Sequence, residues 1–416
     1  MTNKIFNSQE FKLKNGIELV TVKKDTQLFS IHIGLRVGPI YEKESERGIC
    51  HFIEHMLFKG THKRDNHKIN QDFEERAGSY DAYTDYTSTV FSIHALKEEF
   101  EISIDLLSDM IMHSTFPKDE IEKEKKVILS ELKTDLDDVE EFSFIKAHDL
   151  AFCKSPLKHS ILGKQKTVKA FTKEDLVDFY HKNYIPNQCV ISVVSPYEHD
   201  QVQNIIEKYF GDWNKKEEQA RFVCVEKNRN IEKITYKKNI EQSTILFLYT
   251  FHGLTRKEEL ALEILNYKLG ESANSILFRE LREERGFAYD VYSEADPTKF
   301  IKTLVLYTST SKEHIDEAKE VINNCIQKIV HKEISFDDKN ILHMKKVLKT
   351  GIASILEDSQ GLGNYILHQK LMSKKIDAFM EDLKDLEDIN EEDIYKVAQK
   401  ILNEPTIHIL LNEENE

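Results

Sequence analysis

One stretch organises this 416-residue chain: Gly48-Ile49-Cys50-His51-Phe52-Ile53-Glu54-His55-Met56-Leu57-Phe58-Lys59-Gly60-Thr61. Its apolar residues recur at helical spacing, and Gly60 stands where a helix would end. On such a helix His51 and His55 lie one turn apart and project from one face, with Glu54 beside them. Two imidazoles at this spacing can take two corners of a zinc tetrahedron and leave a carboxylate next to the metal-bound water.

The HxxEH order of these residues is the reverse of the commoner HExxH arrangement and matches the inverted zinc-peptidase pattern. The alternative is an ordinary amphipathic helix, because the chain contains 17 histidines and such a motif also arises by chance. A helix without a metal would have little use for two histidines and a glutamate on one stripe. The pattern therefore favours a metal site.

Composition narrows the class of protein. The length fits two domains, and 40% hydrophobic with 31% charged residues is typical of a soluble globular chain. No apolar run approaches a membrane span, and residues 1–10 lack an apolar signal core. The five cysteines form no CxxC pair, which favours reduced thiols and a cytoplasmic location. The net charge of −15 argues against a nucleic-acid partner.

Local signals predict the elements around the helix. Asn15-Gly16 predicts a hairpin, and Glu124 and Glu131 lie seven residues apart on one face of a long charged helix that starts after Pro117. The other expected elements are strands over residues 29–37 and 80–94 and helices over residues 69–76 and 100–113.

The second half of the chain repeats the first. Matching segments recur in the same order, about 210 to 220 residues apart: 75–83 with 284–292, 116–119 with 336–339, and 172–176 with 390–394. At this offset His51 and His55 correspond to Ala261 and Leu265, so only the first copy can hold the metal. We expect an α+β fold with two similar duplicated domains, each an antiparallel-rich sheet packed with helices. The expected boundaries are 1–212 for the catalytic zinc-binding domain, 213–230 for a polar linker, and 231–416 for the non-metal domain.

A catalytic zinc site needs a third protein ligand, and the carboxylates of the long helix are the candidates. Glu131 follows His55 by 76 residues. With this interval the chain resembles the pitrilysin/insulinase family of inverted zinc metallopeptidases, in its short-chain, processing-peptidase-like branch. That family has HxxEH followed some 70 to 80 residues later by a ligand Glu, with another Glu two turns before it. The run from His51 to Thr61 also looks like the family's signature.

The resemblance implies a role for each residue. His51, His55 and Glu131 would bind one zinc per chain, Glu54 would act as general base, and Glu124 would orient a ligand histidine. A solvated charge is the alternative for Glu124.

Substrate contacts follow from the same resemblance. The peptide would add to an edge strand at Asp81-Ala82-Tyr83-Thr84, where the family usually has Asn first. An ionised Asp accepts but does not donate a side-chain hydrogen bond, which puts one substrate contact in doubt. Arg282 and Tyr289 would contact the substrate and the oxyanion, with a surface Arg and a core Tyr as the alternative.

The sequence therefore predicts a zinc-dependent endopeptidase that cleaves peptides or unfolded segments through a metal-activated water. The alternatives are a peptide-binding or chaperone-like relative without cleavage, and the catalytic subunit of a heterodimer. The complete five-residue constellation argues against the first, and the presence of Arg282 and Tyr289 favours a homodimer over the second.

Overall fold

The computed structural model of the protein describes residues 6–217 and 221–413. Residues 1–5, 218–220 and 414–416, including part of the predicted linker, lie outside the described residues. The chain divides into two compact units. Among the described residues, unit 1 comprises those of Met1–Leu132, Ser160–Phe222 and Ala353–Ile376, and unit 2 those of Lys133–His159, Val223–Ile352 and Asp377–Glu416.

Unit 1 is built on a mixed sheet whose described strands follow the order β1-β2-β6-β3-β5-β4. Only β2 and β6 run parallel among these neighbours, and the other pairs are antiparallel. The predicted hairpin at Asn15-Gly16 is confirmed, and Gly16 takes a φ of +99°, which glycine adopts without strain. The strands are β1 (Asn7–Lys12), β2 (Glu18–Lys23), β3 (Leu28–Leu35), β4 (Ser79–Thr84), β5 (Thr89–Leu96) and β6 (Cys189–Ser195).

The prediction of one strand over residues 80–94 was wrong, because the chain reverses there. β4 and β5 form an antiparallel hairpin around Asp85. Asp85 Oδ1 accepts hydrogen bonds from the backbone N–H groups of Thr87 at 2.6 Å and Ser88 at 2.7 Å. Asp85 thus closes a turn through its own side chain. An Asp within the segment indicates such a turn, but the many Tyr, Thr and Val residues around it favoured a continuous strand.

The helices of unit 1 include the predicted ones. α1 (Ile49–Leu57) and the long charged helix α4 (Lys118–Asp137), which belongs to unit 1 as far as Leu132, carry the motif residues. Five apolar residues of α1 are at most 1% exposed, so its packing fixes the helix on the core: Ile49, Phe52, Ile53, Met56 and Leu57. The remaining helices are α2 (Asn66–Glu75), α3 (Phe100–His113), α6 (Gln165–Ala170), α7 (Lys173–Asn183), α8 (His199–Phe210) and α12 (Ser359–Leu371).

Unit 2 is built on a sheet of the same design, with the described order β7-β11-β8-β10-β9. Its first pair is parallel and the others are antiparallel. The strands are β7 (Ile231–Lys237), β8 (Ser243–Thr250), β9 (Ala288–Asp296), β10 (Thr303–Thr310) and β11 (Thr406–Asn412). The α-helices are α5 (Val139–Ala151), α9 (Arg256–Asn266), α10 (Ile315–Val330), α11 (Asp338–Glu357, in unit 2 as far as Ile352), α13 (Ala378–Glu387) and α14 (Glu391–Ile401).

The two sheets confirm the duplication. The order β2-β6-β3-β5-β4 repeats as β7-β11-β8-β10-β9, with the parallel pair at the same place. The repeated segments also begin equivalent helices. α7 starts at a capping box of Thr172 and Asp175, and α14 starts at one of Asn390 and Asp393.

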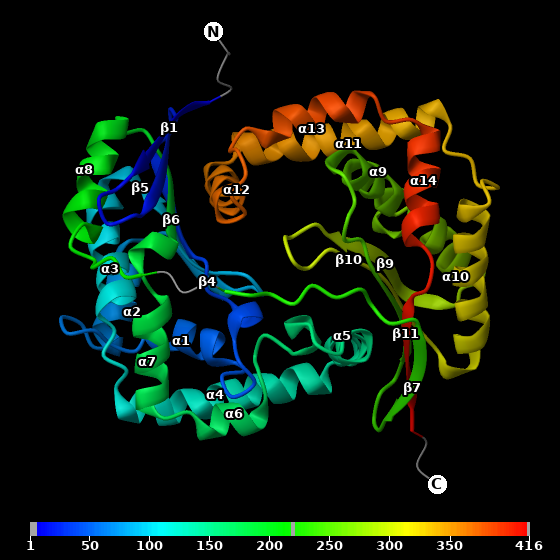
Figure 1. Ribbon diagram of the computed structural model, residues 1–416, viewed down its shortest axis with the longest axis horizontal. Coiled ribbons are helices and arrows are strands. Elements are labelled where there is room, and N and C mark those ends of the chain that lie inside the picture. Colours follow the sequence, from blue (N-terminus) through cyan, green and yellow to red (C-terminus); the bar gives the residue numbers. More distant parts are fainter. Residues whose placement is uncertain (1–5, 218–220, 414–416) are drawn as a thin grey trace. The chain divides into compact units, whose positions relative to one another are not determined.

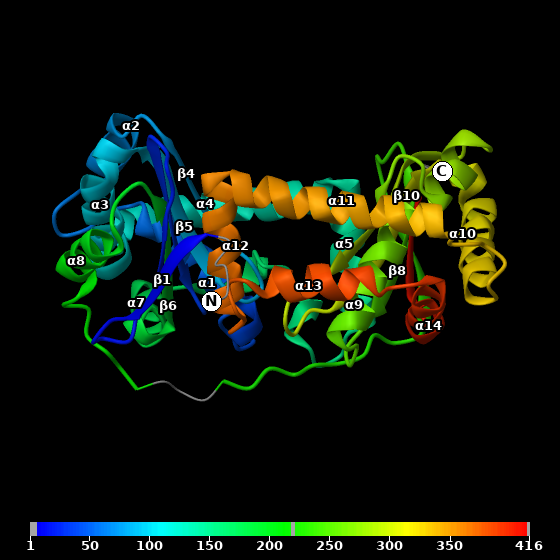
Figure 2. The same cartoon turned by 90° about the horizontal axis from the view of Figure 1, so that it is seen from above.

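One helix of each half packs on the sheet of the other half. α12, from the second half of the sequence, packs on β3 and β6 of unit 1, where both views show it beside the strands (Figures 1 and 2). α5, from the first half, packs on β8 and β11 of unit 2. The units therefore differ from the contiguous domains 1–212 and 231–416 by residues 133–159 and 353–376. Sequence order alone did not indicate this exchange.

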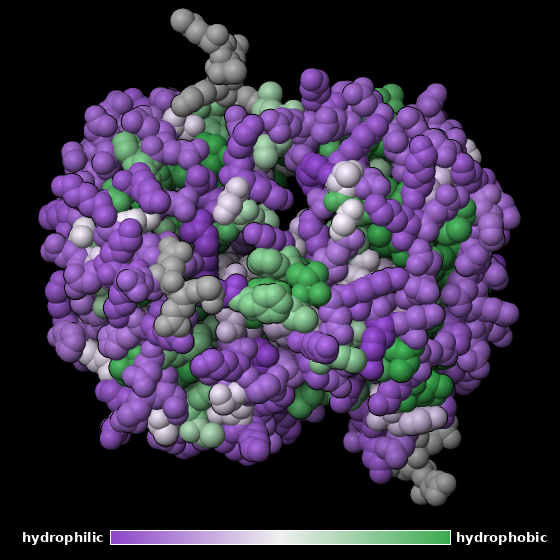
Figure 3. All heavy atoms as spheres, viewed as in Figure 1, coloured by the Kyte–Doolittle hydropathy of each residue, from purple (hydrophilic) through white to green (hydrophobic). Residues whose placement is uncertain are grey.

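Hydrophilic residues cover most of the face seen in Figure 3, as the net charge of −15 would suggest. Within the described ranges, no helix combines the length and the apolar character that crossing a membrane requires.

Candidate metal centre and active site

The start of α1 is fixed by a buried carboxylate and by glycine. Glu42 accepts hydrogen bonds from the backbone N–H groups of Gly48 and Cys50, both at 2.9 Å. A carboxylate at a helix N-terminus satisfies unpaired N–H groups and interacts favourably with the helix dipole. Gly48 has a φ of +93°, and a Cβ there would lie 2.5 Å from the carbonyl oxygen of Leu162. The motif helix therefore begins at a defined point.

Three predicted ligand residues are brought together. His51 and His55 project from α1 and Glu131 from α4, and their ligand atoms lie within 4.8 Å of one another. Glu131 Oε2 lies 3.9 Å from His51 Nε2 and 3.8 Å from His55 Nε2. In the part of the chain that the structure describes, no other trio of His, Cys, Asp or Glu side chains gathers its ligand atoms this closely.

Glu124 contacts the far side of His55. Its Oε2 accepts a hydrogen bond from His55 Nδ1 at 2.9 Å, and its Oε1 pairs with Lys59 Nζ at 2.9 Å. A proton on Nδ1 leaves the lone pair on Nε2, the atom that faces Glu131. Glu124 is 4% exposed, so the solvated charge considered for it from the sequence is not what the structure has.

Glu54 projects from α1 toward the edge strand β4. Its side chain is 8% exposed, and its Oε2 accepts a hydrogen bond of 2.6 Å from Thr84 Oγ1. This contact holds one carboxylate oxygen in place beside the ligand trio. The strand predicted to bind substrate and the residue predicted to act as base are therefore in direct contact.

Burial and neighbouring charges shift the ionisation of these groups. Burial lowers the pKa of His51 to about 3 and raises the pKa of the Glu54 carboxyl. Burial also lowers the pKa of His55, but the surrounding carboxylates outweigh it and raise that pKa above the ordinary value. Burial by itself would raise the pKa of Glu124, but the hydrogen bonds from His55 and Lys59 outweigh burial and hold that pKa below its ordinary value.

The donor set fits a zinc ion. The distances of 3.8 and 3.9 Å between Glu131 Oε2 and the imidazole nitrogens are too long for hydrogen bonds. Two ligand atoms bound at 2.0–2.1 Å in a tetrahedron lie roughly 3.4 Å apart. The observed spacings are within about half an ångström of that value. Two imidazole nitrogens and one carboxylate oxygen leave a fourth position open, as in catalytic zinc sites.

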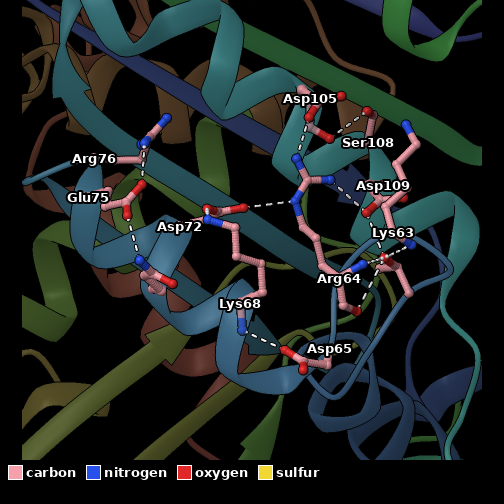
Figure 4. Close-up of polar contacts among 12 residues, drawn as sticks. Lys63, Arg64, Asp65, Lys68, Asp72, Glu75, Arg76, Asp105, Ser108 and Asp109 are labelled. Atoms are coloured by element: carbon pink, nitrogen blue, oxygen red, sulfur yellow. Dashed lines mark hydrogen bonds and ion pairs between the residues drawn. The ribbon is translucent and has the colours of Figure 1, made fainter.

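The loop after α1 is held by a second polar cluster. Arg64 points toward three aspartates from α2 and α3 (Figure 4). Its Nε pairs with Asp72 at 2.9 Å, its Nη1 with Asp109 at 2.7 Å and its Nη2 with Asp105. Thr61 Oγ1 also donates to Asp109 at 2.6 Å. These bonds fix the chain on the C-terminal side of the motif helix.

The second copy of the motif helix has no such chemistry. Ala261 and Leu265 in α9 are fully buried among apolar side chains of unit 2. The duplicated fold therefore does not require histidines at these positions, which supports a specific use for them in α1.

Arg282 and Tyr289 belong to unit 2, and each is exposed. Tyr289 is 74% exposed, which excludes the core tyrosine considered as an alternative. Arg282 Nη1 donates to the carbonyl oxygen of Tyr289 at 3.1 Å. Both line a cavity of about 780 Å³ together with Asp138, Glu140 and Tyr307. Their part in substrate binding stays a prediction.

Two contacts at the site were not predicted from the sequence, those of Lys59 with Glu124 and of Thr84 with Glu54. Lys59 follows His55 by four residues, so helical spacing could have placed it on the same face. Thr84 and Glu54 meet only because α1 packs against β4, and no local pattern encodes that contact.

Comparison with known proteins identifies relatives of this chain. Residues 19–165 match the family described as insulinase (peptidase family M16), and residues 170–346 match the peptidase M16 inactive domain. An uncharacterized zinc protease of Rickettsia felis is 28% identical over 407 residues, which cover 96% of each chain. The beta subunit of the mitochondrial-processing peptidase of Dictyostelium discoideum is 33% identical over 199 residues, which cover 47% of this chain and 42% of that one.

A solved structure shows the same fold. The crystal structure of a protease from Helicobacter pylori superimposes with a TM-score of 0.92 at 19% identity, covering 98% of this chain and 100% of that one. The two family matches together span most of the chain, and the HxxEH helix lies within the first of them. The chain belongs to the insulinase (M16) family of peptidases.

Proposed function

We propose that this protein is a zinc-dependent endopeptidase that cleaves peptides or unfolded segments. The observation that carries the proposal is the convergence of His51, His55 and Glu131 beside the buried carboxylate of Glu54. Relatives named as zinc proteases over nearly the whole chain support it.

The residues of α1 and α4 would have different roles in peptide hydrolysis. His51, His55 and Glu131 would hold the zinc ion, which, when bound, supplies a Lewis acid for peptide hydrolysis. Glu54 would take a proton from the attacking water and pass it to the amine that leaves. Glu124 would keep the His55 ring oriented through Nδ1.

The edge of the first sheet would bind the substrate. β4 pairs with β5 on one side, and no strand of the described residues pairs with its other side. An extended peptide can add to such an edge through backbone hydrogen bonds. Asp81, Ala82, Tyr83 and Thr84 all lie on β4, and Thr84 connects the strand to Glu54.

Cleavage of a peptide library, read by mass spectrometry, tests the proposal. The parent protein should cleave, a zinc chelator should abolish cleavage, and added zinc should restore it. Glu54→Gln should retain zinc and lose activity by several orders of magnitude, because an amide fills the space without accepting a proton. His55→Ala should lose zinc as well. Cleavage by Glu54→Gln at the parental rate would assign the base to another residue.

We propose further that two chains pair so that Arg282 and Tyr289 of one protomer complete the site of its partner. The exposure of both residues in unit 2 supports this, because strong donors on the surface are available to a second chain. Mixing the inactive variants Glu54→Gln and Arg282→Ala should then restore activity to about a quarter of the parental value, from one intact site in each mixed dimer. Confirmed subunit exchange without recovery would contradict a shared site.

A second candidate is the catalytic subunit of a heterodimer. The 33% identity to a processing-peptidase beta subunit favours it over a relative that binds peptides without cleavage. The two candidates separate in one measurement. A homodimeric enzyme cleaves when purified alone, whereas a heterodimer subunit gains activity only with its unlike partner.

A further inference from the structure

The edge strand β4 is held from both faces at adjacent residues. Successive side chains of a strand point to opposite faces of the sheet. Thr84 points toward α1, where it donates to Glu54. Tyr83 points to the opposite face, toward α12, a helix that comes from the second half of the sequence but belongs to unit 1.

Tyr83 makes its polar contacts with two residues of α12. Its hydroxyl lies 2.8 Å from His368 Nε2 and 3.2 Å from Asn364 Oδ1. The rings of Tyr83 and His368 are nearly parallel, with 14° between their planes. His368 and Asn364 are four residues apart and so lie one above the other on the helix. The two side chains form a polar clamp on the phenol.

Both members of the main contact are neutral. Burial lowers the pKa of His368 and raises the pKa of the Tyr83 hydroxyl. A neutral imidazole has one N–H donor and one acceptor, and a phenol can be either donor or acceptor. The phenol can therefore donate to Asn364 Oδ1 while His368 donates to it, and each group keeps a partner.

The helix that provides the clamp is itself firmly placed. Leu367 is fully buried against the sheet, and Gly363 lies so close to β3 that an added Cβ would be 2.7 Å from the His32 ring. Arg36 donates to the carbonyl oxygens of Lys370 at 2.8 Å and Leu371 at 3.2 Å, which ties the end of α12 to unit 1. Tyr83 is thus bound to a rigid element.

We infer that His368 and Asn364 are positioning residues for the active site. By holding Tyr83 they fix the end of β4, so that Thr84 keeps its hydrogen bond to Glu54 and the outer edge of the strand is in place for the peptide. The inference rests on the proposed function and adds a support from the second half of the sequence to the catalytic site of the first. Nothing in HxxEH or its spacing points to these residues.

The test is steady-state peptide cleavage by Tyr83→Phe and His368→Ala, with His368→Gln as the conservative variant. The first two should lower kcat/KM roughly tenfold, the equivalent of one hydrogen bond. His368→Gln should recover most of the activity, because its amide nitrogen can reach the phenol. Tyr197→Phe is the matched control: it removes a tyrosine hydrogen bond of 2.8 Å, to Lys97, elsewhere in unit 1 and should change kcat/KM less than twofold.

Thr84→Val removes the hydroxyl that contacts Glu54. This variant tests whether Tyr83 acts on the active site through Thr84 or only stabilises the fold. If Tyr83 acts through Thr84, adding Tyr83→Phe to Thr84→Val should lower kcat little further, whereas independent effects would multiply. Hydrogen exchange over residues 79–90 gives a readout without catalysis. It should quicken in His368→Ala and stay unchanged in Tyr197→Phe, with the zinc content of all variants equal.

The outcomes distinguish the two proposals. A parent protein that cleaves while Tyr83→Phe and His368→Ala match it overturns the positioning role alone. Full multiplication of the Tyr83 and Thr84 effects also overturns that role. A parent protein that cleaves no peptide with zinc present overturns the proposed function and the inference together.

Discussion

Glu124 and Glu131 lie on one helix but meet different atoms of His55. Both are carboxylates on one face of α4, yet one contacts Nδ1 of His55 and the other faces Nε2. The ring nitrogen that each carboxylate meets therefore decides whether we expect it to orient the imidazole or to share a metal ion with it. The distinction depends on where α4 lies against α1.

The two carboxylates should differ when each is changed to Gln. Glu131→Gln should lower zinc affinity the more strongly, because it removes the charge of a proposed ligand. Glu124→Gln should lower it about 10–100-fold, as the loss of an orienting contact does. Competition with a chelator measures both affinities, and Glu122→Gln, an exposed partner of Lys125 on the same helix, is the control. A larger loss in Glu124→Gln would reverse the assignment.

His32 makes unit 1 sensitive to acid. Burial lowers its pKa from the ordinary value of 6.5 to about 4, so between these values the unfolded chain binds a proton that the folded chain does not. Stability is therefore lost as the pH falls from about 6.5 to 4, by about 3 kcal/mol for this residue.

Urea unfolding of the parent protein and of His32→Gln across this pH range measures the effect. The difference in unfolding free energy between the two should shrink or change sign as the pH falls, since only the parent carries the buried imidazole. A pH-independent difference would show that His32 is not the titrating group. Its ring contacts Ser30 Oγ at 2.9 Å, which the Gln side chain can also reach.

At the scale of elements, α12 depends on close approach to the sheet. Gly363 on α12 lies too close to the His32 ring for an added Cβ, and a Cβ at Gly34 on β3 would press against the side chain of Leu371. The Cβ of an alanine at Gly34 would lie 2.9 Å from Leu371 Cδ1. Close packing, and not backbone conformation, favours glycine at both positions, since neither residue has a positive φ.

Gly363→Ala should destabilise the protein relative to Gly351→Ala. Both glycines are in helices, so both gain helix propensity on substitution, but an added Cβ meets His32 at 2.7 Å in one case and open space in the other. Overpacking should make the two unfolding free energies differ by about 1–3 kcal/mol. Equal thermal or urea midpoints for the two variants would contradict the close approach.

At the scale of the whole molecule, the exchange of α5 and α12 makes the two halves of the chain interdependent. α12 covers a cluster of buried side chains on the first sheet that includes Val20, Val22 and Val194. Exposing each such side chain costs about 1.5–3 kcal/mol, whereas a whole domain is stable by only about 5–15 kcal/mol. Without α12 the first half of the chain would lose most of its free energy of unfolding.

Residues 1–230 and 231–416 should therefore not fold separately. Each half expressed alone should aggregate or unfold without cooperativity, and the two expressed together should yield a soluble complex. Size-exclusion chromatography and thermal unfolding check this. A monomeric 1–230 fragment with the parental unfolding midpoint would show that α12 is dispensable.

The local features of this protein were predictable from its sequence. The extent of α1, the Asn15-Gly16 hairpin and the capping boxes of α7 and α14 each depend on residues within one or two turns of one another. That His51, His55 and Glu131 come together was also predictable, because His51 and His55 share a helix face and Glu131 stands at the interval typical of the family. Duplication was readable because the two copies kept matching segments in the same order.

Tertiary structure alone decided which surfaces meet. Tyr83 and His368 lie 285 residues apart, and Thr84 meets Glu54 across a helix–strand interface. The apolar residues of α5 and α12 form no clear stripe along one helix face, so hydrophobic periodicity indicates neither which face of each helix is buried nor which sheet receives it. The pairing is set by shape: the glycines of β3 and α12 allow the close approach that places His368 against the edge strand.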